Sequence, residues 1–167
     1  MAFFPLPQVP KLSYRDQGRA FGAERPNQRK HAGCDLLIDE GTDILAVEDG
    51  EVFELVPDFY HGTGAIALRH RGFIARYCEV KTESLANVRR GQLFKAGEVV
   101  AKVGRMFSLS MLHFELYSGR GAGGLTVRTN LPYQRRSDLL DPSSLLDQLA
   151  NGGSGPATID ADAWAPR

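Results

Sequence analysis

The chain has 167 residues, 43% of them hydrophobic, which is enough for one domain with its own core and too little for two large independent domains. Its 20 Lys and Arg residues balance its 20 Asp and Glu residues, so no overall charge would draw it to nucleic acid or to an anionic membrane. No apolar run approaches the roughly 20 residues of a membrane-spanning helix, so we expect neither a membrane span nor a nucleic-acid partner.

The N-terminal residues do not fit a Sec signal peptide. They lack a basic stretch before their apolar residues, and prolines interrupt them at positions 5, 7 and 10. We therefore expect a cytoplasmic protein or one exported by a route that needs no N-terminal signal. Residues 1–20 should be irregular, and the segment from Pro5 to Arg29 should lead into the first strand without regular structure.

The middle of the chain is punctuated by turn residues. Many of its 18 glycines and 9 prolines separate short β-branched and aromatic runs, a pattern typical of short strands joined by tight turns. The predicted fold class is all-β, an antiparallel sandwich or barrel-like sheet. Strands are expected at Cys34–Ile38, Ile44–Val47, Glu51–Val56, Ala65–His70, Phe73–Val80, Val99–Val103 and Leu112–Tyr117.

One short helix is expected near the C-terminus, over Ser143–Ala150. Asp141 is placed to cap it, Pro142 suits its first position, and Gly152 follows its end. Its apolar stripe consists of Leu145, Leu146 and Leu149.

The domain should therefore span residues 21–150, with residues 151–167 as a flexible tail. Within it, the glycine-rich stretch Ser118–Arg136 is expected to be a long surface loop, and loops of that length often carry function.

Two short segments carry side chains of the kind that bind metals. His31 and Asp35 stand four residues apart at a turn into the first predicted strand, so they would converge only through local bending. In the last predicted strand, alternation places Met111, His113 and Glu115 on one face and apolar side chains on the other. Each histidine taken alone is compatible with an ordinary surface or hydrogen-bonded residue.

Longer motifs connect these segments. In order along the chain they are His-x-Gly-x-Asp from His31, Gly-Thr-Asp-Ile-Leu-Ala-Val-Glu-Asp-Gly-Glu-Val from Gly41, Arg-His-Arg-Gly-Phe-Ile-Ala-Arg-Tyr from Arg69, Val-Arg-Arg-Gly-Gln-x-x-Lys-Ala-Gly-Glu from Val88, and Leu-His-Phe-Glu from Leu112. In this series the chain resembles the lysostaphin/LytM family of zinc metallopeptidases, from about Phe21 to Asp141-Pro142. The resemblance implies the lysostaphin-type peptidase fold.

The resemblance also implies a Zn²⁺ site. The family's ligands are the His and Asp of its first motif and the last His of a His-x-His motif, which correspond here to His31, Asp35 and His113. Two imidazoles and one carboxylate leave a fourth position for water or substrate, as in catalytic zinc sites. Zinc held in this way lowers the pKa of water and polarises a peptide carbonyl.

Two histidines of the family pattern are replaced. The His-x-His motif is Met111-Leu112-His113 here, and the Tyr-x-His motif is Tyr77-Cys78-Glu79. Met111 can neither accept a proton nor donate to an oxyanion. Glu79 is a carboxylate of the kind that acts as general base in other zinc peptidases. We expect strand alternation to place Glu79 on the face of Tyr77, with Cys78 pointing away into the core.

Two functions remain open. The first is a zinc-dependent metalloendopeptidase that acts on peptidoglycan cross-links or other Gly- or Ala-rich peptides, with Glu79 as general base and Tyr77 or a groove side chain as carbonyl partner. His61 and Met111 would line its groove, and Glu115 would support a ligand from behind. The second is a catalytically degenerate zinc-binding domain that recognises cell-wall peptide or a protein partner, which the replaced histidines favour.

Other functions fit the residues less well. A lipoyl or biotinyl carrier needs a modifiable lysine at a hairpin tip, and none is evident; a phosphocarrier that uses His113 would not need Asp35. The two cysteines, Cys34 and Cys78, are expected as buried core thiols, with a single disulfide as the alternative. His70 falls at a family position that is usually structural. We expect a monomer.

Overall fold

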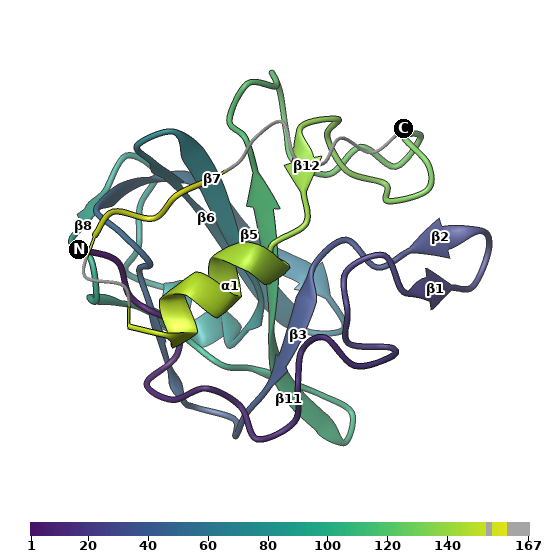
Figure 1. Ribbon diagram of the computed structural model, residues 1–167, viewed down its shortest axis with the longest axis horizontal. Helices are drawn as coiled ribbons and strands as arrows, with labels where there is room; N and C mark the ends of the chain where they lie inside the picture. The colour runs from purple at the N-terminus through teal and green to yellow at the C-terminus, as the bar shows by residue number, and fades with distance from the viewer. Residues whose placement is uncertain (153–154, 160–167) are drawn as a thin grey trace.

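The computed structural model describes residues 1–152 and 155–159. Its main feature is an antiparallel sheet in which the strands follow the order β10-β11-β7-β6-β5-β8, while β3 and β12 also pair with β11 (Figure 1). The bounds are β3 (Cys34–Leu37), β5 (Gly50–Tyr60), β6 (Thr63–His70), β7 (Phe73–Val80), β8 (Leu93–Phe94), β10 (Arg105–Met106), β11 (Leu109–Tyr117) and β12 (Leu139–Leu140).

Smaller elements complete the fold. Two further pairs are β1 (Glu24–Arg25) with β2 (Arg29–Lys30) and β4 (Asp43–Leu45) with β9 (Val99–Lys102). A 3-10 turn, η1, covers Thr82–Leu85, and one helix, α1, covers Ser143–Ala150. The structure thus confirms the mainly antiparallel β class with one short C-terminal helix. The domain limits expected from the sequence stay predictions.

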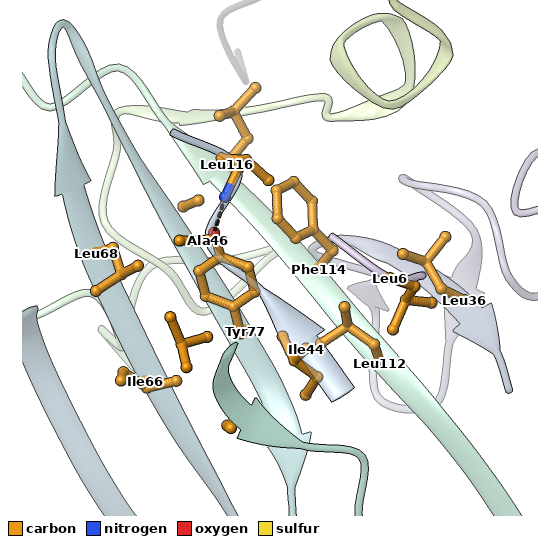
Figure 2. Close-up of a cluster of buried hydrophobic side chains, with 14 of the residues drawn as sticks. Leu6, Leu36, Ile44, Ala46, Ile66, Leu68, Tyr77, Leu112, Phe114 and Leu116 are labelled. Atoms are coloured by element: carbon orange, nitrogen blue, oxygen red, sulfur yellow. Dashed lines mark hydrogen bonds between the residues drawn. The ribbon is translucent and has the colours of Figure 1, made fainter. Parts of the chain in front are cut away.

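One face of the sheet carries the main hydrophobic core. Strand alternation turns Leu112, Phe114 and Leu116 of β11 to this face, where α1, the β4–β9 pair and the N-terminal segment cover them. Tyr77 of β7 is fully buried here, its ring 5.5 Å from that of Phe114, and its hydroxyl accepts a hydrogen bond of 3.0 Å from the Val47 backbone N–H (Figure 2).

The opposite face is covered by the segment 118–138. Here Ile74 and Tyr117 pack with Leu125 and Leu139 in a smaller cluster. Buried charged groups share this face, because Arg76 of β7 stands directly across from Glu115 of β11. The sheet therefore separates an apolar core from a layer of buried charge.

The segment from Pro5 to Arg29 is not wholly irregular, contrary to the prediction. It contains all of the β1–β2 hairpin except Lys30, and the turn uses left-handed backbone at Asn27 (φ 63°) and Gln28 (φ 59°). Both strands are polar, so no apolar alternation marks them in the sequence. The Lys30 N–H donates to the Pro132 carbonyl at 2.9 Å, which joins this hairpin to the loop beside it (Figure 1).

The C-terminal helix lies where the sequence predicts it, and its three leucines are buried. The N-cap residue is Pro142 and not Asp141 as predicted, although Asp141 Oδ1 accepts a hydrogen bond of 2.8 Å from the Ser143 N–H. In the predicted tail, Ala157 and Ile159 pack against the main core, and residues 153–154 and 160–167 lie outside the described part.

None of the described helices is long and apolar enough to cross a bilayer.

Gly33 allows β3 to approach β11. A Cβ atom at this position would lie 2.3 Å from the Phe114 carbonyl oxygen and 3.0 Å from Nε2 of His113. Because the first of these is a backbone atom in the middle of the sheet, it cannot move aside cheaply.

We expect Gly33→Ala to lower the free energy of unfolding by at least about 2 kcal/mol, because the strand pair must separate to admit the methyl group. Gly124→Ala is the control, since no atom lies within 4 Å of a Cβ there. Urea denaturation followed by circular dichroism measures both. Equal stability of the two variants would contradict the role given to Gly33.

Candidate metal centre

Three donor atoms converge where β3 meets β11. Asp35 stands directly across from His113 in the strand pair, and His31 lies just before β3. Asp35 Oδ1 lies 3.0 Å from His31 Nε2 and 2.9 Å from His113 Nδ1, and the two ring nitrogens are 3.0 Å apart. The structure thus brings together the three residues that the family pattern singled out, and all three are buried.

The other nitrogen of each ring has its own acceptor. His31 Nδ1 lies 2.8 Å from the carbonyl oxygen of Ala20, which can only accept, so it carries the proton. His113 Nε2 lies 3.0 Å from Glu115 Oε1 and donates to that carboxylate. Both tautomers therefore turn an imidazole lone pair toward Asp35, as in protein sites that bind a metal through histidine.

This donor set fits a cation. Two lone pairs and a carboxylate oxygen that face one another at about 3 Å repel unless positive charge lies among them. Ligands of a tetrahedral zinc ion, with bonds of about 2.0–2.1 Å, lie roughly 3.3 Å apart, so the triangle needs to widen only slightly. A mixed nitrogen and oxygen set with two imidazoles favours zinc over calcium or magnesium.

The pKa values agree with a site built for positive charge. Burial opposes the charged form of His113, but hydrogen bonds and charges of Asp35 and Glu115 outweigh it and raise the pKa of His113 to about 10. Burial lowers the pKa of His31. Without a metal, the cluster therefore keeps one proton, on His113, and a metal ion would take its place.

Glu115 lies behind His113 and is itself held by cations. Arg135 Nε donates to its Oε1 at 2.8 Å, Arg76 Nη1 approaches its Oε2 at 3.4 Å, and the Tyr117 hydroxyl donates to Oε2. Burial alone would raise the pKa of Glu115, but the charges of Arg135 and Arg76 hold it well below its ordinary value. The carboxylate thus remains ionised and orients His113.

Glu79 reaches the groove beside this cluster because β7 bulges there. The pairing with β6 passes from Val80 to Cys78 and leaves Glu79 unpaired, with left-handed backbone (φ 63°). Its Oε2 is buried and has no hydrogen-bond partner, and burial raises the pKa of Glu79 to about 7. An unpaired carboxylate in this position can accept a proton.

The bulge also overturns the expected faces of its neighbours. Tyr77 points into the main core and not into the groove, so the pairing of Tyr77 with Glu79 on one face was wrong. Cys78 is buried on the side of the charged cluster, where its Sγ lies within 4.8 Å of donor atoms of His113 and Glu115. Burial and the charge of Glu115 raise the pKa of its thiol, which disfavours a metal-binding thiolate.

Cys34 lies in the main core as expected, and both cysteines are free thiols.

A groove of about 410 Å³ opens onto the cluster, and Glu79 and Met111 line it together with Phe59, Tyr60, Thr126 and Tyr133. Glu115 is fully buried behind His113 and does not line this groove. His61 lies outside the lining as well, where its ring contacts those of Tyr60 (4.1 Å) and Phe107 (4.8 Å).

Sequence reasoning missed the arginines of this site. Arg76 stands among apolar residues in a strand, and because a charged side chain is buried there only when it is paired, its position in the sequence indicates a buried ion pair. Arg135 lies in an irregular loop, where no periodicity indicates which side chains turn inward. The Ala20 carbonyl that fixes the tautomer of His31 is a backbone atom, which side-chain patterns do not reveal.

Comparison with known proteins gives concordant results. The model of Peptidase family M23 matches residues 29–124. The catalytic domain of the antimicrobial peptidase lysostaphin from Staphylococcus simulans is 22% identical, with 79% of this chain and 92% of that chain covered and a TM-score of 0.59. LytU is 24% identical, with 84% of this chain and 90% of that chain covered and a TM-score of 0.59. A zinc-containing peptidase from Vibrio cholerae is 24% identical, with 70% of this chain but only 36% of that chain covered and a TM-score of 0.51. No curated protein matches the chain.

The raised pKa of Glu79 predicts a pH-dependent stability effect in chelator-treated protein. Because the folded pKa of about 7 exceeds the ordinary 4.5, the folded state holds this proton more tightly, and stability is lost as pH rises between the two values. Glu79→Gln should therefore raise the free energy of unfolding by roughly 2–3 kcal/mol at pH 8 and change it little at pH 4. Thermal melts at both pH values measure this, with the exposed Glu83→Gln as control; an equal effect at both values would contradict the assignment.

Proposed function

This chain belongs to peptidase family M23, and on that premise we propose that it is a zinc-dependent metalloendopeptidase that cleaves peptide cross-links of peptidoglycan. The observation that carries the proposal is the triangle of His31, Asp35 and His113, with both imidazole lone pairs directed at one carboxylate oxygen. The likeness to lysostaphin, an antimicrobial peptidase, supports the substrate class.

In this proposal His31, Asp35 and His113 are the zinc ligands. Each contributes one donor atom, so a fourth position remains open to the groove. Bound zinc supplies Lewis-acid activation of water and of the scissile carbonyl. Glu115 acts as a positioning residue, because it accepts a hydrogen bond from the Nε2–H of His113 and so keeps Nδ1 free as a ligand atom.

Glu79 is proposed as the general base. The sequence resemblance aligns it with a histidine of the family's Tyr-x-His motif. Its Oε2 has no hydrogen-bond partner, and it lines the groove. Its carboxylate takes a proton from the attacking water and returns it to the leaving amine. A neighbouring cation would lower its pKa from about 7, which keeps it ionised and ready at neutral pH.

The carbonyl partner must be a groove side chain, since Tyr77 lies in the core. Arg25 is the best-placed candidate, because its Nη2 lies 3.8 Å from Asp35 Oδ2 at the edge of the cluster. Its guanidinium also donates to the carbonyls of Gly18 and Glu24, which hold it in place. A fixed cation beside the reacting carbonyl stabilises the negative charge that develops there.

One observation favours the second function, a binding domain without turnover. Met111 lines the groove beside His113 at the other histidine position of the family pattern, and its thioether cannot donate a hydrogen bond. A domain that has lost both histidines can still bind zinc and cell-wall peptide.

We expect one zinc ion per chain, bound by the three proposed ligands. His113→Ala should lose it, because the remaining pair of donors is too few for a tight site. His61→Ala is the matched control, since His61 lies outside the donor cluster. Elemental analysis of protein purified without chelator measures the zinc content. Stoichiometric zinc in folded His113→Ala protein would refute the ligand assignment.

Glu79→Gln should keep zinc and fold but lower the turnover of purified peptidoglycan by about two to four orders of magnitude, the usual contribution of a general base. Met111→His restores the missing donor and should raise turnover. Release of soluble muropeptides measures both. Equal cleavage by wild type and Glu79→Gln would remove Glu79 from the mechanism, whereas zinc binding without cleavage by wild type or Met111→His would establish the binding function.

A further inference from the structure

The groove is strongly basic although the chain as a whole carries no net charge. Five basic side chains line it, against the two carboxylates of Asp35 and Glu79. We call these five residues the basic wall: Arg25, Arg29, Lys30, Arg128 and Arg135. Such a concentration of one charge beside a site raises the local concentration of ligands of opposite charge.

Two segments that are held together form the basic wall. One is the β1–β2 hairpin, and the other is the loop that follows β11. Besides the hydrogen bond from Lys30 N–H to the Pro132 carbonyl, the rings of Phe21 and Tyr133 stack with centroids 5.0 Å apart across this junction. The two segments are therefore already joined, so a ligand need not bring them together on binding.

Three members of the basic wall have no part in the proposed function. Arg135 is committed to Glu115, and Arg25 lies beside Asp35 as the proposed partner of the scissile carbonyl. Among the described residues, no ion pair involves Arg29, Lys30 or Arg128; Arg29 donates only to the Pro26 carbonyl. Lys30 and Arg128 are exposed at the groove, and Glu24, across the hairpin from Lys30, makes no ion pair with it.

A neutral peptide would leave these cations unmatched. Polyglycine or polyalanine offers them only backbone carbonyls as acceptors. A carboxylate can accept two hydrogen bonds from the Arg128 guanidinium and can form an ion pair with the Lys30 ammonium. The two carboxylates of the lining already have other roles in the proposed function, Asp35 as a metal ligand and Glu79 as the general base. The complementary anion must therefore come from the ligand.

We propose that the groove selects peptides that carry a free carboxylate close to the bond held at the cluster, and that Lys30 and Arg128 bind that carboxylate. The inference rests on the proposed function for the peptide nature of the ligand. The carboxylate can belong to an acidic side chain or to a free C-terminus, since either presents the same two oxygens to the basic wall.

Three dansyl-labelled probes separate these sources: pentaglycine amide, pentaglycine with a free C-terminus, and Gly-Gly-Glu-Gly-Gly amide. Fluorescence anisotropy of the full chain, read before any cleavage, measures their binding with zinc present and after chelation. The chelated sample shows the contribution of the basic wall without direct carboxylate binding to the metal.

At least one carboxylate probe should bind about three- to tenfold more tightly than pentaglycine amide in both samples, and added salt should reduce the difference. Lys30→Gln combined with Arg128→Gln should abolish the preference. Arg71→Gln, which removes an exposed charge outside the groove, should leave it unchanged.

Equal binding of all three probes, no measurable binding of either carboxylate probe, or an unchanged preference in the double variant would each overturn the inference. The probe that gains affinity identifies the source of the carboxylate. Tighter binding of a carboxylate probe without cleavage of any peptide would contradict the proposed hydrolysis and still support this inference. Cleavage without tighter binding of a carboxylate probe would contradict this inference alone.

Discussion

The antiparallel pairing of β3 with β11 places Asp35 directly across from His113, and the arrangement of the site depends on this register. A slip of one residue would turn His113 into the apolar core and bring Leu112 or Phe114 to the groove. The register is secured on the core face of the sheet, because the neighbouring residues Leu36, Leu112 and Phe114 are fully buried there. The packing that stabilises the fold therefore also holds the donor atoms together.

Behind the donor atoms lies a layer of buried charge that an apolar core would not contain. Glu115, Arg76 and Arg135 are costly to bury singly, but together they satisfy one another, and Arg76 also pairs with Glu54 at 2.8 Å. Phe59 packs its ring against the guanidinium of Arg76 at 4.7 Å. This layer keeps one tautomer of His113 and so links the loop after β11 to the chemistry of the groove.

Much of the architecture follows from local sequence patterns, because alternation and turn residues report on strands directly. The three proposed ligands were found because they occur in motifs whose order matches a family. The orientation of Tyr77, Cys78 and Glu79 was not predictable from alternation, since a single extra residue reverses the phase of a strand. Polar elements such as the β1–β2 hairpin and the loop that carries Arg135 are positioned by tertiary contacts, for which the local sequence holds no periodic signal.

The bulge in β7 has a consequence for how the chemistry of this fold can diversify. Residue 79 has no pairing partner on β6, and its carbonyl oxygen is satisfied by the Gly104 N–H at 3.0 Å whatever the side chain is. The identity of the side chain is thus separated from the hydrogen bonds that maintain the sheet. Exchanges at this position therefore change the chemistry of the groove without removing a hydrogen bond of the sheet, as long as the new side chain tolerates the left-handed backbone there.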